Sequence, residues 1–187
     1  MEFLEVEKVL KDYGKYVVQQ SKSNLTKSGK GDGALYNSIS FEIIEDNTAV
    51  IVEFWMEDYG SFVDDGVKGA NPRLVDSEKT GRKGRQKAPY SKFSYKSKRP
   101  PLDMLVAWAK RKNVRFRIKK GQKGGGQFKK GSYRQMGFWL QKSIFAQGMS
   151  PTYFFSKPFA KGIEKYELEM SKAFTRDIES KMIFTEK

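Results

Sequence analysis

Hydrophobic positions along the chain follow two different periods, which predict long helices at both ends and a hairpin between them. Apolar residues recur every three or four positions from Phe3 to about Asn24 and from about Lys157 to Met182, as on one face of an α-helix. Segments 38–44 and 49–56 instead alternate apolar and polar residues around a polar turn, which is typical of a β-hairpin. We therefore expect helices packed on a small antiparallel sheet.

Shorter patterns fill the middle of the chain. A short helix is predicted over 58–65, stopped by Gly66, and a second helix follows Pro100 and Pro101. A strand is predicted over 114–118 and a further helix over 133–145. We expect Trp108 and Trp139, on these two central helices, to join the core together with Phe154.

Two segments lack periodicity and are rich in lysine, arginine and glycine. They cover residues 67–99 and about 119–132. We predict one α+β domain over 1–187, with a small antiparallel β-sheet packed by N-terminal, central and C-terminal helices and these two segments as basic, flexible insertions. Deleting 77–98 should then cost little stability, because an unpacked arm contributes few buried contacts.

Composition limits the chemistry. The 187 residues include neither histidine nor cysteine, which excludes zinc fingers, thiol chemistry, disulfides and a histidine base. No apolar run approaches the ~18 residues of a membrane span. The first residues are acidic where a signal peptide is basic. We expect an intracellular or particle-borne protein with no membrane partner and no cofactor.

Charge is distributed unevenly along the chain, whose formal net charge is +14. Residues 1–65 carry 6 basic and 13 acidic side chains, net −7, whereas residues 66–134 carry 22 basic and 3 acidic side chains, net +19. The remaining residues carry 8 basic and 6 acidic side chains, net +2. The basic excess therefore belongs to the middle of the chain, which indicates contact with a polyanion or a solvated, flexible arm.

The candidate contact residues are the basic side chains of the two insertions and of the helix between them. They are Arg82, Lys83, Arg85, Lys87, Lys96, Lys98, Arg99, Lys110, Arg111, Lys112, Arg115, Arg117, Lys119, Lys120, Lys129 and Lys130. Aromatic residues are interleaved with them, namely Tyr90, Phe93, Tyr95, Phe116 and Phe128, as in surfaces that stack bases while pairing phosphates. Non-specific contact with DNA and docking on an acidic protein both remain open.

Adjacent carboxylates at Asp64 and Asp65 raise the question of a metal-dependent nuclease. With Glu53 and Lys68 they offer the residue types of a magnesium site. Their spacing matches no nuclease motif, and adjacent residues on a helix point in different directions. We therefore interpret the pair as solvated charges near a helix end, and predict no metal site and no enzymatic activity.

Four short motifs, in order along the chain, resemble the tail-completion or neck family of tailed bacteriophages. Residues 33–39 resemble the family's Thr-Gly-x-Leu-Arg-x-Ser-Ile, with Asp32 in place of threonine and Tyr36 in place of arginine. Residues 59–66 resemble its Tyr-Ala-x-x-Val-Glu-x-Gly. The Pro100-Pro101 helix start with Leu105 and Trp108 resembles Pro-Pro-x-x-x-Ile-x-x-Trp. The segment from 138 to 159 resembles the helix–Gly-x-x-Pro-x-x-Phe ending.

The resemblance implies a structural virion protein without catalysis. It implies an α+β subunit that assembles into a ring at the head–tail junction, between portal or adaptor proteins on the head side and tail proteins on the other, around the DNA channel. Localisation would be the virion neck, after assembly in the host cytoplasm. A small sheet leaves edges that a ring neighbour can cover. The alternatives are a stand-alone basic nucleic-acid-binding protein and the nuclease.

Overall fold

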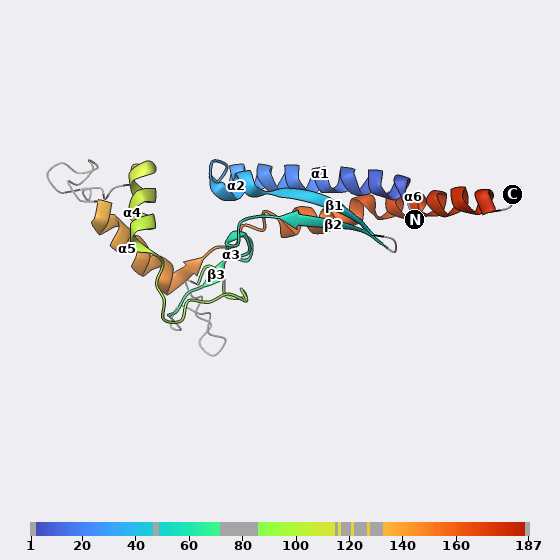
Figure 1. Ribbon diagram of the computed structural model, residues 1–187. Helices are drawn as coiled ribbons and strands as arrows, with labels where there is room; N and C mark the ends of the chain where they lie inside the picture. Colours follow the sequence, from blue (N-terminus) through green and yellow to red (C-terminus); the bar gives the residue numbers. More distant parts are fainter. Residues whose placement is uncertain are drawn as a thin grey trace. The chain divides into compact units, whose positions relative to one another are not determined.

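A computed structural model describes residues 3–46, 49–71, 86–114, 116, 121, 127 and 133–185. Its elements are α1 (Leu4–Lys27), α2 (Ala34–Ser38), β1 (Ser40–Asp46), β2 (Ala49–Trp55), α3 (Gly60–Asp65), β3 (Val67–Lys68), α4 (Leu102–Arg111), α5 (Tyr133–Gln147), β4 (Gly148–Met149) and α6 (Ser156–Thr185) (Figure 1). Both two-stranded sheets are antiparallel, β1 with β2 and β3 with β4. The fold is α+β, as the hydrophobic pattern predicts.

The chain divides into two compact units, a division that the sequence analysis does not predict. The hairpin unit consists of residues 1–64 and 152–187, and the basic unit consists of residues 65–151. The chain leaves the hairpin unit after Asp64 and returns at Thr152. The predicted terminal helices and hairpin lie in the first unit, and the predicted central helices lie in the second.

In the hairpin unit, α1 and α6 run antiparallel and the hairpin lies along α1 (Figure 1). Two glycines allow this close approach. A Cβ at Gly14 would lie 2.4 Å from the ring of Phe41, and one at Gly162 would lie 2.6 Å from the ring of Tyr13. Gly14 lowers helix propensity in α1, as the sequence suggests, and the contact with β1 explains why a larger side chain does not fit there.

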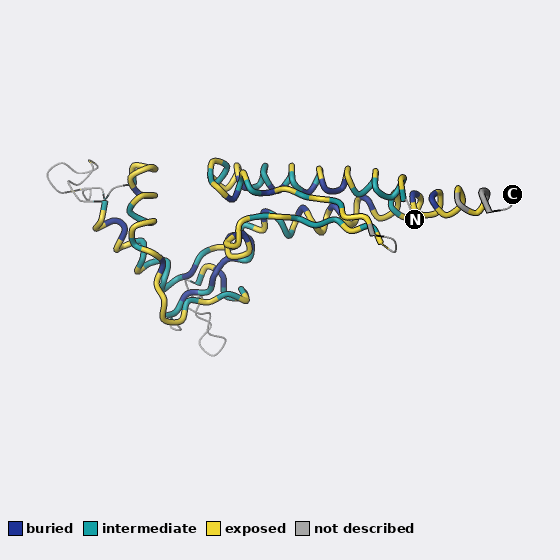
Figure 2. The backbone as a smooth tube through the Cα atoms, in the orientation of Figure 1, coloured by how far each residue is buried: buried dark blue, intermediate teal, exposed yellow. Residues whose placement is uncertain are grey.

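The hairpin places its alternating residues as predicted. Phe41 pairs with Phe54 and Ile43 pairs with Val52, all on the face toward the helices. The ring of Phe54 makes edge contacts with Tyr13 at 5.9 Å between centroids. Buried side chains recur along both long helices, separated by exposed ones (Figure 2).

Phe154 is completely buried, which confirms its predicted place in the core. It packs with Leu25, Leu35, Ile39 and Val63, which join α1, the segment around α2, and α3. A second cluster contains Tyr13, Val17 and Tyr166 between α1 and α6. These contacts hold the hairpin unit together.

The N-terminus of α1 is capped by a residue from the other end of the chain. Phe3 is the N-cap residue of α1, and its side chain makes no capping hydrogen bond. Instead the buried carboxylate of Asp177, on α6, accepts the backbone N–H groups of Glu5 at 3.1 Å and Val6 at 3.0 Å. The cap satisfies donors that helices leave unpaired at their N-termini.

In the basic unit, α4 packs on α5, and β3 pairs with β4. The side chain of Gln86 donates to Gly69 O at 2.9 Å and accepts from Gly69 N–H at 2.8 Å. The expected core roles of Trp108 and Trp139 are wrong, because these side chains are 39% and 54% exposed. Ala109 and Met136 occupy the buried positions of α4 and α5 instead.

The predicted flexible insertion over 67–99 is packed where the structure describes it, over 67–71 and 86–99. Lys68 N–H donates to Phe93 O at 2.8 Å, and Tyr95 N–H donates to Lys68 O at 2.9 Å. Ala88 is buried. The premise that this arm is unpacked is therefore wrong for 86–98, so we expect the deletion of 77–98 to cost more than an unpacked arm would, and residues 72–85 lie outside the described part.

The remaining predictions for the middle of the chain are only partly tested. Val114 and Phe116 belong to no strand, which corrects the predicted strand over 114–118 at these two positions. Arg115 and 117–118 lie outside the described residues, as does most of the second predicted insertion. Among the described helices, none combines the length and hydropathy that a membrane crossing requires.

Candidate DNA-binding and docking surfaces

The two units carry opposite net charges. The hairpin unit has 13 basic and 18 acidic side chains, net −5, whereas the basic unit has 23 basic and 4 acidic side chains, net +19. The charge boundary therefore coincides with a structural boundary. Surfaces for anionic partners belong to the basic unit, and surfaces for cationic partners belong to the hairpin unit.

Seven of the predicted contact residues lie in the described part, and all of them are exposed. These are Lys87, Lys96, Lys98, Arg99, Lys110, Arg111 and Lys112. The other nine lie outside the described residues, namely Arg82, Lys83, Arg85, Arg115, Arg117, Lys119, Lys120, Lys129 and Lys130. The described candidates form two groups, one before α4 and one at its end, and Lys87 lies apart from both in sequence.

The first group projects from an irregular segment that is fixed at both ends. At one end, the Tyr95 hydroxyl donates to Met149 Sδ at 3.4 Å, and burial raises the pKa of Tyr95. At the other end, Gln141 Nε2 donates to the carbonyl of the buried Pro100 at 2.7 Å. Lys96, Lys98 and Arg99 lie between these anchors. A partner can bind them without paying to order the backbone that carries them.

The second group closes α4. Lys110 and Arg111 lie in its last turn, where positive charge favours the negative end of the helix dipole. Lys112 follows as the C-terminal cap residue, and its N–H donates to Trp108 O at 2.9 Å. The side chains of Lys110 and Arg111 and the backbone of Lys112 therefore stabilise the helix end in addition to any contact with a partner.

The interleaved aromatic residues do not form the expected base-stacking surface. Tyr95 packs on Phe145, with ring centroids 6.0 Å apart, and Phe116 packs on Trp139 at 6.1 Å. Lys92 Nζ lies 5.1 Å from the ring centroid of Phe93. Tyr90 alone of the described aromatic candidates is almost fully accessible, at 96%. Among the described aromatic candidates, Tyr90 is therefore the one most accessible for stacking on a base, beside the exposed basic side chains that can pair with phosphates.

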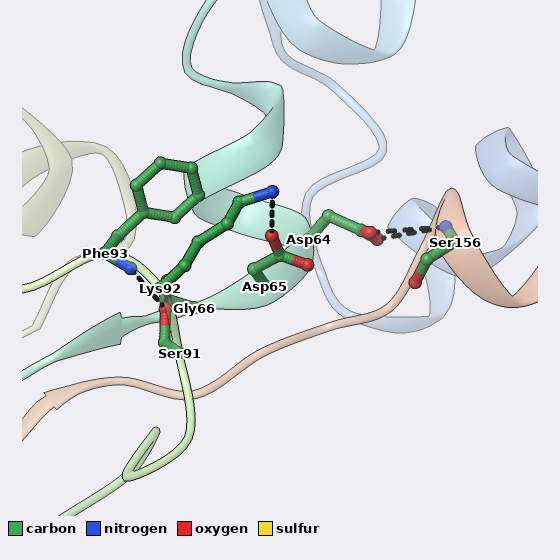
Figure 3. Close-up of polar contacts among 7 residues, drawn as sticks. All are labelled: Asp64, Asp65, Gly66, Ser91, Lys92, Phe93 and Ser156. Atoms are coloured by element: carbon green, nitrogen blue, oxygen red, sulfur yellow. Dashed lines mark hydrogen bonds and ion pairs between the residues drawn. The ribbon is translucent and has the colours of Figure 1, made fainter.

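Asp64 and Asp65 bind different groups, as Figure 3 shows. The buried carboxylate of Asp64 accepts the backbone N–H of Phe155 at 2.9 Å and of Ser156 at 3.2 Å, at the start of α6. Asp65 Oδ2 forms an ion pair with Lys92 Nζ at 2.9 Å. The interpretation as a solvated charge is therefore wrong for Asp64, which is buried and caps a helix, whereas Asp65 stays partly exposed at the end of α3 and is ion-paired.

Residues next to Asp65 also fix the segment that contains Lys92, and we call Asp64 to Gly66 with Ser91 to Phe93 the corner. Ser91 Oγ donates to Gly66 O at 2.7 Å and accepts the N–H of Phe93 at 3.1 Å (Figure 3). Gly66 adopts a φ of +72°, and a Cβ there would lie 2.5 Å from Met149 O. Across the described residues, no three acidic side chains gather as metal ligands. The corner thus has a structural role.

The outer face of the hairpin is a surface that the sequence analysis does not single out. Ile44 and Ile51 are cross-strand partners, and both are exposed there. Trp55, at the end of β2, is 55% exposed. The alternation that assigns Phe41 and Phe54 to the core also assigns these three residues to the opposite face. The Glu42–Glu53 pair lies between the two isoleucines and Trp55, so this face combines exposed apolar and acidic side chains.

A hollow of about 280 Å³ lies beside Trp55 and is lined by Ser38, Trp55, Met56, Glu57 and Asp58. Ser38 Oγ accepts the N–H of Glu57 at 3.0 Å and so fixes the backbone of its acidic rim. Glu57 and Asp58 are exposed, and the ion pairs found among the described residues do not include them. An aromatic wall with two carboxylates suits a lysine or arginine side chain.

Comparison of the chain with protein-family models, with curated proteins and with solved structures finds no match.

Proposed function

We propose that this protein is a structural subunit of the bacteriophage neck, which assembles into a ring around the DNA channel and joins the head connector to the tail. The observation that carries the proposal is the order of the four motifs along the chain. They fall on successive features of the fold: the lead into β1, helix α3, the start of α4, and the passage from α5 into α6.

The contacts within these motifs support a structural role. Asp64, in the second motif, caps α6 at the end of the fourth. Tyr59, also in the second motif, accepts through its hydroxyl the N–H of Leu35 in the first motif, at 3.0 Å. The motif residues thus bind one another and build the subunit, as expected for a protein whose function is assembly.

Removing the gene from the phage that carries it tests this function. We expect filled heads and complete tails that fail to join, and we expect purified protein to restore joining when it is added to the mixed extract. Electron microscopy would show the protein as a ring at the junction. Joined, infectious particles that form without the protein would refute the proposal.

A second candidate function is non-specific nucleic-acid binding, which the net charge of +19 on the basic unit favours. Binding through Z phosphate contacts gives a slope of log K against log salt near −0.9Z for duplex DNA. Reversing Arg82, Lys83, Arg85 and Lys87 should flatten that slope if these residues contact DNA. An unchanged slope, with loss of binding to a neck neighbour, would favour protein docking.

A further inference from the structure

We propose that the acidic hollow beside Trp55 binds the basic segment 96–99 of a second copy of this chain. The proposal rests on the ring assembly proposed above and names the contact that would hold neighbouring subunits together. It assigns one surface to the hairpin unit and the complementary surface to the basic unit. Each copy therefore carries both halves of the contact.

The hollow provides the chemistry that a basic side chain requires. Trp55 is 55% exposed, and an indole ring attracts a cation through its quadrupole. Glu57 and Asp58 are exposed and line the same hollow. A guanidinium or ammonium group seated there would meet an aromatic face and two negative charges together. DNA, whose phosphates are negative, would be repelled from this surface.

The exposed face next to the hollow extends the contact area. On the outer face of the hairpin, the Glu42–Glu53 pair lies between the Ile44–Ile51 pair and the Ser40–Trp55 pair. A neighbour that covers Ile44 and Ile51 removes their apolar surface from water, which favours the contact. The charged hollow would then set the orientation of the neighbour.

Segment 96–99 is better prepared for this contact than the basic group at the end of α4. Its backbone is anchored through Tyr95 and Pro100, as described above. Lys96 and Lys98 are exposed, and none of the ion pairs found among the described residues involves them. Lys110 and Arg111, by contrast, already interact favourably with a helix terminus.

The occupant we infer is a second copy, because charge complementarity is built into the chain itself. The hairpin unit is net −5 and the basic unit is net +19. Contact between unlike surfaces of identical subunits is heterologous, and such contacts close into rings when the rotation between neighbours allows it. We infer that this contact, repeated from subunit to subunit, is the one that closes the proposed ring.

A charge-swap experiment on the purified full-length chain tests the contact. Variant A carries Glu57→Lys and Asp58→Lys, and variant B carries Lys96→Glu and Lys98→Glu. We expect wild type to self-associate in a concentration-dependent manner at low salt, and each variant alone to self-associate at least tenfold more weakly. An equimolar mixture should recover association, because the reversed hollow of A then complements the reversed segment of B.

Matched controls reverse the same number of charges elsewhere. Glu167→Lys with Glu169→Lys changes exposed residues of α6, and Arg134→Glu with Lys142→Glu changes exposed residues of α5 in the basic unit. Both controls should associate as wild type does. Light scattering and analytical ultracentrifugation report the association, and circular dichroism verifies that each variant is folded.

Three results would overturn the proposal. They are a wild-type chain that stays monomeric at every concentration at low salt, variants A and B that associate as wild type does, and a mixture that recovers nothing. If the charge swap succeeds but particles join without the protein, the contact stands and the neck function fails. If particles require the protein but the charge swap fails, the neck function stands and this contact is wrong.

Discussion

At the scale of single residues, two buried aspartates perform the same task at opposite ends of the hairpin unit. Asp64 accepts backbone N–H groups at the start of α6, and Asp177 does so at the start of α1. Each carboxylate comes from a segment distant in sequence from the helix that it caps. Helix ends are therefore fixed by tertiary contacts, which the local sequence does not encode.

Asp177→Ala should destabilise the protein by about 1–3 kcal/mol, because it leaves two N–H groups of α1 without their acceptor. Asp177→Asn, which keeps an acceptor oxygen, should cost less. The matched control Glu179→Ala lies on the exposed face of the same helix and should have little effect. Denaturant unfolding of the three variants measures these differences. Equal stability of Asp177→Ala and wild type would contradict the capping role.

Because Tyr13 is buried, we expect the free energy of unfolding to depend on pH in the alkaline range. Burial raises the pKa of Tyr13 to about 12 from its usual value of 10.0. The unfolded chain therefore loses this proton first as the pH rises, and the stability that the buried neutral phenol contributes falls between pH 10 and about 12. Below pH 10 the contribution is fully present.

Tyr13→Phe removes this titration while keeping the ring in place. The Tyr13 hydroxyl makes only a long hydrogen bond, 3.5 Å to Phe159 O, so the substitution should cost little at neutral pH. The free energy of unfolding, followed from pH 8 upward, should fall less steeply for the variant than for wild type. Parallel curves would show that Tyr13 does not titrate differently in the two states.

At the scale of elements, the hydrophobic period predicted most of what the structure contains. The long terminal helices, the hairpin with its inner face and the short helix α3 all lie near their predicted positions. Periodicity succeeds there because each element buries one regular face. It does not reveal that residues 86–99 pack, because their contacts are backbone hydrogen bonds and single buried side chains such as Ala88.

The central helices illustrate a second limit. The apolar residues of α4 and α5 recur with a helical period and correctly predict the two helices. The period does not show which of the large side chains faces the partner helix. A Cβ at Gly137 would lie 2.5 Å from Val106 Cγ2, so α4 and α5 approach closely at a small residue, and Trp139 remains outside. The alternation of apolar and polar residues in β1 and β2 also predicts which residues lie on the outer face of the hairpin. The hollow at the end of that face depends on the path of the chain after β2, which the alternation does not predict.

A pair of substitutions tests this assignment. Phe154→Ala should cost about 3–5 kcal/mol, because it empties a fully buried site. Trp139→Ala should cost clearly less, because about half of this side chain already contacts water. Thermal and denaturant unfolding of both variants gives the comparison. A larger loss for Trp139→Ala would show that its exposure is removed in the folded protein in solution.

At the scale of the whole molecule, the opposite charges of the two units predict different responses to salt. The net charge of +19 destabilises the basic unit through self-repulsion, which added salt screens with a Debye length of about 10 Å at 0.1 M. Sodium chloride should therefore raise the unfolding temperature of the basic unit more than that of the hairpin unit, whose net charge is −5.

Tryptophan fluorescence can report each unit separately. Trp108 and Trp139 lie in the basic unit and Trp55 lies in the hairpin unit. Trp55→Phe leaves reporters in the basic unit alone, and Trp108→Phe with Trp139→Phe leaves one in the hairpin unit alone. The reporters should diverge as salt is added. Identical shifts for both reporters would show that the chain unfolds as one cooperative whole, irrespective of the local charge.

The place where the chain leaves and re-enters the hairpin unit has a consequence for the history of this protein. The N–H groups of Thr152 and Tyr153 both donate to Asp64 O, each at 3.0 Å. These hydrogen bonds hold the outgoing and the returning segments of the chain together. Joining Asp64 directly to the returning chain would therefore need only a short turn and little loop-closure entropy. We therefore expect that a lineage can lengthen or shorten loops of the basic unit while the hairpin unit keeps its fold. Relatives of this chain should then differ most in what they carry between these two neighbouring positions.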